Sequence, residues 1–525
     1  MGNGENVFST YDALRYARLA KEIQSGTYSS IDYLSNVPDY RANSEPPFLL
    51  PQLAVLISDI FKIKLEFIFA FLPPILGILF VIPLFFWIKT FTNKTELRYV
   101  FAGSALLGLF NFIYAVRTPP GYFDTDCLVL FFIFSIVLFI TYAVKEKEDA
   151  VKSYSYIVIA AVLYKLFLWW YDVYLFGVLF IASLFIGLYL FKHEKRHFIL
   201  KMLLFIFFLD INSLWRGYNT LISYFRSVFL KDSVDLLPVS IFSTINEFKP
   251  LSIVQFVAFT TDNYATAIIG LIAIGFLFVR FFKHMAIIAP IIFIGLAAFK
   301  MGNRYIMYLA PFMGMGIGYV VYSSMNYIRG KYAVSGKLIA LMSGILLVFM
   351  CFPLRTFYYS PKPFLDSQFI KSLKYIKDNT EKNSFIWTWW DMGFIVQYFA
   401  ERGTYIDGAN YHPAKMYFIA RSLMTDDELY AKRAISFVSN NLTKDYLKKG
   451  TTLTELHEKV EKYESTLLKP VYIMIDKSMV EYQFIHKLGL NIAGNDADAI
   501  RMPLFQKPVK CNKLGATARY DCLSL

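Results

Sequence analysis

Charged residues and cysteines are both scarce in this chain of 525 residues, in which Asp, Glu, Lys and Arg together make up 18%. Four cysteines are too few for a disulfide framework. The start, MGNGENVFST, lacks the apolar core of a cleavable signal peptide. The sequence also contains no internal repeat and no low-complexity segment. These absences exclude a disulfide-held scaffold and a repeat architecture.

Apolar residues dominate instead, with 56% hydrophobic and 18% aromatic residues and a mean hydropathy of +0.44. This composition is far too apolar for a soluble protein of this length, so the chain is expected in a membrane. About ten runs are long enough to cross the ~30 Å of hydrocarbon in a bilayer. They cover residues 67–88, 99–116, 127–144, 154–170, 172–191, 198–214, 265–282, 284–299, 305–325 and 338–353.

Basic residues orient these runs, because cytoplasmic connections carry an excess of Lys and Arg. Five basic connections occur after every second run in the list, so one topology satisfies all of them. The regions 1–66, 117–126, 215–264, 300–304 and everything after 354 then face outward. The net charge of +13 is spread over both sides, so no nucleic-acid partner is expected. The basic residues are Lys89, Lys94, Arg98, Lys145, Lys147, Lys152, Lys192, Lys195, Arg196, Arg280, Lys283, Arg329, Lys331 and Lys337.

The predicted fold is a polytopic α-helical membrane protein with a mixed α/β extracytoplasmic domain. Residues 1–355 form the transmembrane part with its outer loops, and 356–525 form the outer domain. In the outer domain FIWTWW (385–390) and VYIMI (471–475) read as buried strands, and 425–465 as helices. Because nothing carries residues 1–66 across the membrane, we expect the natural N-terminus to lie upstream.

Carboxylates are few on the side predicted to face outward. Asp12 lies in TYDALRYAR, Asp124 and Asp126 form a D-x-D in GYFDTDCLVL, and Glu247 lies in STINEF. A D-x-D after a glycine-containing turn offers two hard oxygen ligands to Mg²⁺ or Mn²⁺. Each acid taken alone fits a solvated helix cap better than a ligand.

Two further features point to binding. Arg304 begins a run from the outer side, against the charge rule, which favours an anionic partner such as a lipid pyrophosphate; a snorkelling arginine is the alternative. In WTWWDMG (387–393), Trp389 and Trp390 can form an apolar wall beside one acceptor, Asp391. That arrangement suits a small hydroxyl-bearing side chain, although a core tryptophan pair with a capping Asp has the same pattern.

Four of these motifs together resemble one family. WWDMG is similar to the WWDxG signature of the oligosaccharyltransferase catalytic subunit, of the single-subunit PglB type in bacteria. GYFDTD resembles the second D-x-D region of that family, TINE its TIxE loop, and TYDALRYAR the segment with its first metal-binding Asp. Their order and sidedness agree with the predicted topology. The resemblance implies the GT-C glycosyltransferase fold.

The resemblance also implies a role for each residue. Asp12 and Glu247 would be catalytic, and they would share a divalent metal, Mn²⁺ or Mg²⁺, with Asp124 and Asp126, supported by Arg117. Arg304 would contact the donor pyrophosphate and Tyr171 would line the active site. Met479 resembles the start of an M-x-x-I motif, from which the chain departs with Tyr482 in place of Ile. The acceptor Ser/Thr pocket would consist of Trp389, Trp390, Asp391 and Met479.

The predicted function is transfer of a glycan from a lipid-linked donor to Asn in N-x-S/T sites of polypeptides. A related lipid-linked sugar transferase acting on hydroxyl or lipid acceptors is the alternative, and a transporter is a third hypothesis. A transporter favours polar residues at the bilayer midplane, whereas the acids here gather at one surface. We expect a monomer in the plasma membrane, spanning it several times, with the catalytic part on the periplasmic side.

Overall fold

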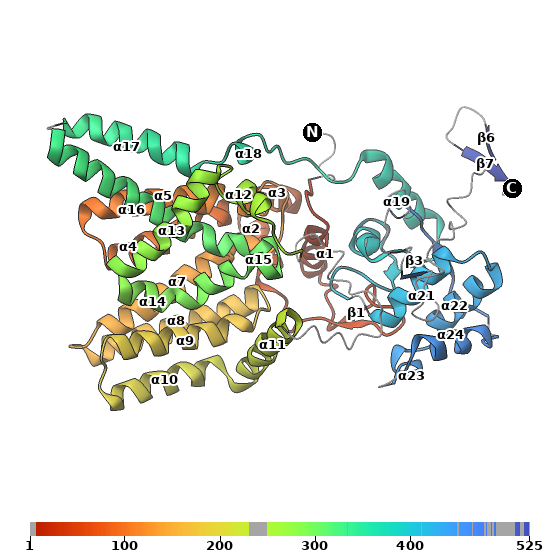
Figure 1. Cartoon of the computed structure of the whole chain (residues 1–525). Coiled ribbons are helices and arrows are strands. Elements are labelled where there is room, and N and C mark those ends of the chain that lie inside the picture. Colours follow the sequence, from red (N-terminus) through yellow and green to blue (C-terminus); the bar gives the residue numbers. More distant parts are fainter. Residues whose placement is uncertain are drawn as a thin grey trace. The chain divides into compact units, whose positions relative to one another are not determined.

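The chain folds into two units, shown in the computed structural model of Figure 1. The structure describes residues 7–229, 249–332, 334–410, 412–448, 451–464, 466–476, 479, 485, 488–489, 510–514 and 519–523. Of these, unit 1 contains 7–16, 46–229 and 249–364, and unit 2 contains 17–45 and the residues from 365 onward. The first helix, α1 (Asp12–Ser25), is shared, because the division falls after Tyr16.

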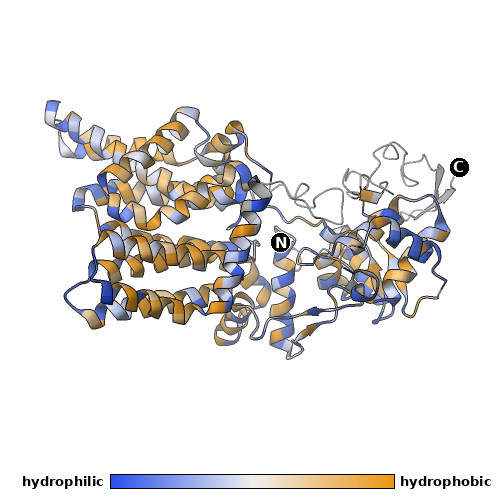
Figure 2. Cartoon of the chain, turned by 60° about the horizontal axis from the view of Figure 1, so that its bottom comes forward, coloured by the Kyte–Doolittle hydropathy of each residue, from blue (hydrophilic) through white to orange (hydrophobic). Residues whose placement is uncertain are grey.

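Unit 1 is a bundle of helices that are apolar along most of their length, as the colouring of Figure 2 shows. Helix α7 is the most enclosed of the candidate spans, because 83% of its apolar stretch is buried inside the protein. The helices up to residue 229 are α2 (Leu49–Phe61), α3 (Leu65–Ile78), α4 (Val81–Lys89), α5 (Lys94–Phe110), α6 (Phe112–Ala115), α7 (Asp126–Lys145), α8 (Ala150–Trp170), α9 (Leu175–Leu190), α10 (Lys195–Leu209) and α11 (Ile211–Phe229). Those after residue 249 are α12 (Ile253–Thr260), α13 (Tyr264–Arg280), α14 (Phe282–Leu296), α15 (Ala298–Met301), the 3₁₀ turn η3 (Asn303–Tyr305), α16 (Ile306–Tyr332), α17 (Gly336–Cys351) and α18 (Leu354–Phe357).

The prediction of a polytopic helical membrane protein is confirmed, but within the described residues the number of candidate spans is lower than the ten predicted runs. Among the described residues, five helices are long and apolar enough to span a membrane, and up to seven if each of two sharply bent helix pairs counts as one span. Helices α9 and α17 have 16 residues each. At ~1.5 Å per residue they reach about 24 Å, less than the ~30 Å of hydrocarbon.

One predicted run, 198–214, ends in a bend that the sequence analysis missed. Helix α10 stops at Leu209, and α11 continues at 89° to it. Asp210 between them has a positive φ of 63°, and its carboxylate accepts the N–H groups of Asn212 at 2.7 Å and Ser213 at 3.2 Å. These bonds begin a new helix, because they satisfy N–H groups that have no partner in the first turn.

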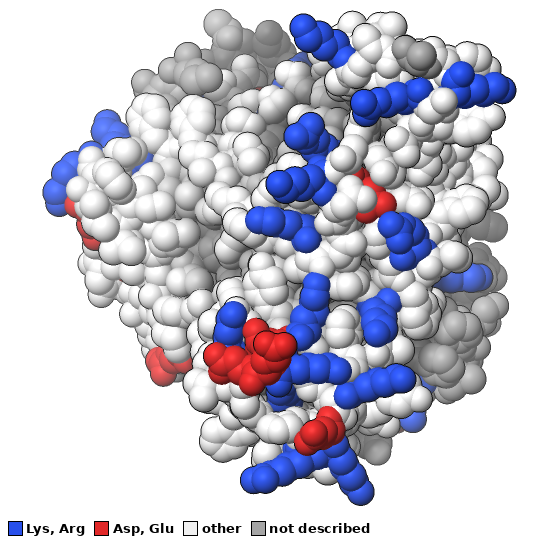
Figure 3. Space-filling model, turned by 90° about the vertical axis from the view of Figure 1, so that its left-hand side faces the viewer, with Lys and Arg blue, Asp and Glu red and all other residues white. Residues whose placement is uncertain are grey.

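All five basic connections lie at one end of the unit 1 helices. They join α4 to α5, α7 to α8, α9 to α10, α13 to α14 and α16 to α17, on the left in Figure 1. Figure 3 looks onto this end, where Lys and Arg outnumber Asp and Glu. The common sidedness of the basic connections agrees with the prediction. Which end faces the cytoplasm stays a prediction.

Glycines allow the backbones of helices α5 and α16 to approach each other closely. A Cβ on Gly103 would overlap the carbonyl oxygen of Gly314, and a Cβ on Gly314 would overlap that of Gly103. Ser104 donates a hydrogen bond across the same interface to the Pro311 carbonyl, at 2.8 Å. Small residues allow membrane helices to approach closely and gain van der Waals contact.

Unit 2 is built around a small parallel sheet in the order β4-β3-β5. Strand β3 pairs with β4 through Phe385 and Gly403, and with β5 through Phe385 and Val471. The elements are β1 (Ile31–Asp32), β2 (Arg41–Ala42), α19 (Ser367–Asn379), β3 (Phe385–Trp387), the 3₁₀ turn η4 (Trp390–Met392), α20 (Gly393–Ile395), the π-turn η5 (Val396–Ala400), β4 (Gly403–Thr404), α21 (Pro413–Met424), α22 (Glu428–Asn440), α23 (Thr443–Tyr446), α24 (Leu453–Glu461), β5 (Val471–Ile473), β6 (Lys510–Leu514) and β7 (Arg519–Leu523).

The predicted mixed α/β character of this region is confirmed, with two differences of detail. The strand predicted over 385–390 ends at Trp387, because the chain turns into η4 at Trp390. The strand predicted over 471–475 is shorter, Val471–Ile473, and the prediction that it is buried was wrong. Tyr472 and Ile473 are 38% and 54% exposed, as side chains of an edge strand can be.

We predict that Gly103→Ala lowers the free energy of unfolding by about 1–3 kcal/mol, because the added methyl group forces α5 and α16 apart. The matched control is Gly344→Ala in α17, where a Cβ would meet no atom within 4 Å. Denaturation of the purified chain in detergent measures both variants. Equal stability of the two variants would contradict the close approach.

Candidate functional site

The turn between α6 and α7 is held by its glycine. Gly121 has a φ of 83°, and a Cβ there would overlap the Val7 carbonyl oxygen. Its N–H donates to the Ala70 carbonyl at 3.0 Å, and its own carbonyl accepts the Ser9 N–H at 3.1 Å. Only glycine adopts this backbone at no steric cost. The loop that carries the D-x-D is therefore fixed to both the N-terminal segment and α3.

Asp124, the first acid of the D-x-D, is buried just before α7. Its Oδ1 accepts the N–H of Thr125 at 2.5 Å and the Thr125 hydroxyl at 3.2 Å. The Thr125 carbonyl in turn accepts the indole N–H of Trp170 at 2.7 Å, from the end of α8. Both of these hydrogen bonds end on Oδ1, and neither involves Oδ2.

Asp126, the second acid, opens α7 and is fully buried. One of its oxygens pairs with Arg117, and the other accepts from Nη2 of Arg304 at 2.7 Å. The same Nη2 donates to the Tyr171 hydroxyl at 2.7 Å, and the guanidinium carbon lies 5.5 Å from the centre of the Tyr171 ring. The structure thus brings together five of the residues named from the sequence: Arg117, Asp124, Asp126, Tyr171 and Arg304.

Asp12, at the start of α1, adds its charge to this cluster although its side chain is exposed. Burial, and after it the negative charges of Asp126 and Asp12, raises the pKa of Asp124 to about 8. A buried carboxylate beside like charges is costly to ionise. A nearby cation would relieve that cost, so the electrostatics of these three acids suit a positively charged ligand.

The metal site itself is not complete within the part of the chain that the structure describes. There, no group of three or more His, Cys, Asp or Glu side chains is close enough to hold an ion. Glu247, the fourth predicted ligand, lies outside the described residues. The oxygen donors Asp12 and Asp124 fit a hard divalent cation in their chemistry.

A cavity of about 240 Å³ adjoins Arg304 and contains residues that the sequence analysis missed. The lining is rich in phenol groups, from Tyr171, Tyr174, Tyr305 and Tyr308, and Asp172 also contributes. Phenol and guanidinium groups together can donate hydrogen bonds to an anion. The sequence contained a signal, because Tyr174 is three positions after Tyr171, and Tyr305 and Tyr308 are one and four positions after Arg304.

In unit 2 the WWDMG motif forms the bend that follows β3. Trp389 is 2% exposed, whereas Trp390 and Asp391 are half-buried in η4. A Cβ on Gly393 would lie 2.5 Å from the Asp407 Cβ, so the glycine lets this bend pack directly on the chain after β4. Met479 is buried in the same unit, and its N–H bonds to the Asp476 carbonyl at 3.0 Å.

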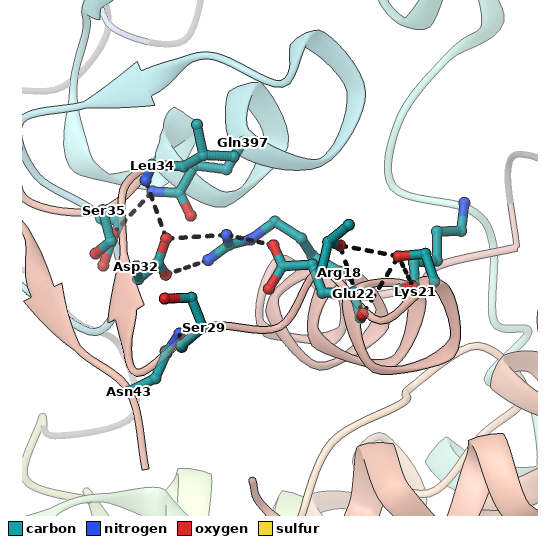
Figure 4. Close-up of polar contacts among 12 residues, drawn as sticks. Arg18, Lys21, Glu22, Ser29, Asp32, Leu34, Ser35, Asn43 and Gln397 are labelled. Carbon is teal, nitrogen blue, oxygen red and sulfur yellow. Dashed lines mark hydrogen bonds and ion pairs between the residues drawn. The ribbon is translucent and has the colours of Figure 1, made fainter. Parts of the chain in front are cut away.

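Residues 17–45 pack within unit 2, which the sequence did not indicate. Figure 4 shows the Arg18 guanidinium from α1 pairing with Asp32 of β1 and, at 2.9 Å, with Glu22. Burial opposes ionisation of Asp32, but the charge and hydrogen bond of Arg18 prevail and lower its pKa. The Asp32 carboxylate also accepts the Leu34 N–H at 3.0 Å.

This N-terminal segment supports the bend that carries WWDMG. The Ser35 hydroxyl donates to Asp407 at 2.5 Å, and Gln397 donates to the same carboxylate oxygen at 2.9 Å, near Ser35 in Figure 4. Asp407 is fully buried and packs against Gly393. Ser35, Gln397 and Asp407 therefore position the motif, and none of them was a predicted site residue.

Two family comparisons match most of the chain. Residues 45–357 match the family "Oligosaccharyl transferase STT3, N-terminal", and residues 382–484 match the "STT3/PglB/AglB core domain". The undecaprenyl-diphosphooligosaccharide-protein glycotransferase of Campylobacter jejuni is 22% identical to this chain over 478 residues. The match covers 82% of this chain but 64% of that protein, so the chain spans less than two thirds of this relative.

Solved structures of the Archaeoglobus fulgidus oligosaccharyltransferase have a similar fold. The enzyme tethered with an acceptor peptide containing the NVT sequon superimposes with a TM-score of 0.66 and 13% identity, covering 99% of this chain and 70% of that chain. Its complex with Zn and sulfate gives a TM-score of 0.56 and 14% identity, covering 83% and 63%. At these identities the likeness shows the fold.

We predict that Asp126→Asn lowers the free energy of unfolding by about 3–5 kcal/mol, because it leaves two guanidinium groups beside a neutral side chain in a buried site. The matched control, Lys152→Gln, removes an exposed ion pair of unit 1 with a separation of 3.5 Å and should cost less than about 1 kcal/mol. Thermal unfolding in detergent compares them. A cost for Asp126→Asn no larger than the control's would show that the cluster does not depend on this charge.

Proposed function

The chain belongs to the STT3 family of oligosaccharyl transferases, and on this basis we propose that it transfers an oligosaccharide from a polyprenyl diphosphate to Asn in N-x-S/T sites of proteins. The chain spans 64% of the length of its Campylobacter jejuni relative, so activity, donor and acceptor are proposals for this chain. The observation that carries them is the cluster of Asp124, Asp126 and Arg304 at the end of the helix bundle away from the basic connections.

The placement of this cluster supports chemistry at a membrane surface. Helix α7 contains 20 residues, from Asp126 to Lys145, which belongs to a basic connection. At ~1.5 Å per residue this corresponds to about 30 Å, one hydrocarbon thickness. An enzyme that takes a lipid-linked donor needs its charged groups at this depth, where the diphosphate emerges from the bilayer.

The donor diphosphate would be bound by Arg304 and Tyr171. Asp126 and Arg117 hold Arg304 in place, because the Asp126 carboxylate already pairs with both guanidinium groups. An ordered guanidinium can meet a phosphate without losing further side-chain entropy. The tyrosine-rich cavity next to Arg304 provides further donors for the same anion.

The acceptor amide is a poor nucleophile, because its lone pair is delocalised into the carbonyl. Asp12 and Glu247 would accept its two N–H bonds and so hold and polarise it. Asp12, Asp124, Asp126 and Glu247 would hold a divalent cation, which supplies positive charge where negative charge develops. Asp124 suits this role best among the described acids, because Asp126 is already paired with two arginines.

The pattern N-x-S/T would be read by the bend after β3. Asp391 would accept the Ser or Thr hydroxyl, while Trp389, Trp390 and Met479 exclude water from that bond. A hydrogen bond to a charged acceptor is worth ~1.5–3 kcal/mol, which is enough to select an acceptor. This WWDMG bend favours an Asn acceptor over a hydroxyl or lipid acceptor. An enzyme that transfers sugar to a hydroxyl or a lipid does not need to recognise a Ser or Thr two positions after an Asn.

We place the chain among the single-subunit bacterial type, acting as a monomer in the plasma membrane with its acids and unit 2 on the periplasmic side. Mn²⁺ or Mg²⁺ would be the cation.

The direct test mixes the purified chain with an undecaprenyl-diphosphate oligosaccharide and a fluorescent N-x-T peptide, and looks for a mobility shift of the peptide. A Q-x-T peptide that shifts equally would favour a hydroxyl acceptor.

We predict that Asp12→Ala, Asp124→Ala and Glu247→Ala each reduce transfer to the peptide by about a hundredfold or more, because each removes charge from the reacting site. Asp59→Ala, which removes an exposed acid of α2, is the control and should keep parental turnover. A chelator should also stop transfer, and added Mn²⁺ should restore it. Near-normal turnover in the chelator would remove the cation from the mechanism.

A second prediction concerns the acceptor. Asp391→Ala should lower kcat/KM for an N-x-T peptide by about ten- to a hundredfold, because the Thr hydroxyl loses a charged partner. In this variant an N-x-A peptide should be used almost as well as N-x-T. Asp426→Ala, an exposed acid of the same unit, should retain the parental ratio. If Asp391→Ala still prefers Thr to Ala at the parental ratio, another group reads the hydroxyl.

A further inference from the structure

The chain contains two copies of the pattern that it would modify in other proteins. They are Asn93-Lys94-Thr95 and Asn441-Leu442-Thr443. Asn93 caps α5 in a basic connection of unit 1, and its side-chain oxygen accepts the N–H groups of Thr95 at 3.0 Å and Glu96 at 2.9 Å. Asn441 lies in unit 2, which also contains WWDMG. An enzyme for N-x-S/T sites therefore carries such a site in its own outer unit.

The carboxamide of Asn441 has both of its N–H bonds engaged. Asn441 follows α22, and its Nδ2 donates to the Phe437 carbonyl at 2.8 Å and to the Tyr463 hydroxyl at 3.3 Å. The Tyr463 ring packs edge-on against Phe437, with 5.2 Å between the ring centres. Nδ2, the atom to which a sugar would be attached, is thus held by two hydrogen bonds in a half-buried side chain.

The hydroxyl of Thr443 is engaged as well. Asp39 accepts the Thr443 N–H at 2.8 Å and the Thr443 hydroxyl at 2.7 Å. Asp39 pairs at 2.7 Å with Lys415 of α21, whose fully buried ammonium also bonds to Asn36 Oδ1 at 2.7 Å. Two contacts thus fix Asp39: an ion pair on one side and the start of α23 on the other. We name the contact of Asp39 with Thr443 the Asp39 latch.

We propose that Asn441 is a latent glycosylation site, which the Asp39 latch closes in the folded chain and which another copy of the enzyme can modify when the latch opens. The proposal rests on the proposed function. It explains why an acceptor pattern can persist in unit 2: its hydroxyl already has a carboxylate acceptor, and its amide already has two partners.

The transfer step shows what the latch prevents. A bond forms between Asn441 Nδ2 and C1 of the sugar, while the bond from C1 to the diphosphate oxygen breaks. The lipid diphosphate leaves with that electron pair, and Nδ2 gives one proton to a carboxylate of the modifying copy. Before this, the Thr443 hydroxyl must leave Asp39 for the acceptor pocket, and Nδ2 must leave Phe437 and Tyr463.

The experiment measures glycan occupancy at Asn441 by peptide mass spectrometry, after incubation with an undecaprenyl-diphosphate oligosaccharide. The folded parent should remain unmodified, whereas a free peptide of residues 436–448 should be modified. Asp39→Ala should raise occupancy at Asn441 to at least ten times the background signal measured in the parent, and adding Thr443→Val should remove the rise. Asn93 should stay unmodified throughout. Where Ala prevents folding, Asp39→Asn replaces it, with a smaller rise expected.

Tyr463→Phe separates the two halves of the site. It frees part of the amide but leaves the Asp39 latch, so occupancy should stay at the parental level. A rise as large as that of Asp39→Ala would overturn the latch, as would full modification of the folded parent or failure of the free peptide to be modified.

Transfer to an external N-x-T peptide is measured in every sample. An Asp39→Ala chain that modifies this peptide but not its own Asn441 overturns the latch alone. Absence of transfer to the external peptide by the parent overturns the proposed function, and with it the latch.

Discussion

A single buried carboxylate with two guanidinium partners organises unit 1. Asp126 pairs with Arg117, nine residues before it, and with Arg304, which precedes α16. Removing such charges from water costs several kcal/mol per ion, so the cluster is poor evidence for extra stability. Its effect is positional. It fixes Arg304 beside Tyr171. The hydrogen bonds that Asp124 accepts come instead from Thr125, which is uncharged.

Much of the fold follows from hydropathy and charge, because both act locally along the chain. The order of helices and the common side of the basic connections required only runs of apolar residues and the positions of Lys and Arg. Helix ends were harder to predict. The bend at Asp210 depends on one side chain, whose carboxylate accepts N–H groups in the first turn of α11. Helix α17 begins after Ser335, whose side chain accepts the Leu338 N–H.

The candidate site also contains some residues that sequence patterns indicate and others that only the folded structure reveals. Asp124, Asp126 and Arg304 could be singled out, since acids and an arginine are unusual at the ends of apolar runs away from the basic connections. The supports of WWDMG could not. Ser35 and Asp407 are 372 positions apart, and nothing in either local sequence indicates their hydrogen bond. Contacts of this kind come from the packing of unit 2, which joins residues 17–45 to the sheet.

An enzyme that recognises a three-residue pattern competes with folding for the same polar groups. The carboxamide and hydroxyl of an N-x-S/T site must be unbonded to enter an acceptor pocket, whereas folding pairs most buried polar groups. Each such hydrogen bond contributes ~0.5–1.5 kcal/mol net, and more when one partner is charged. Thr443 in its contact with Asp39 illustrates the charged case. Selectivity among acceptors is then set partly by local opening of the acceptor and not by the pocket alone.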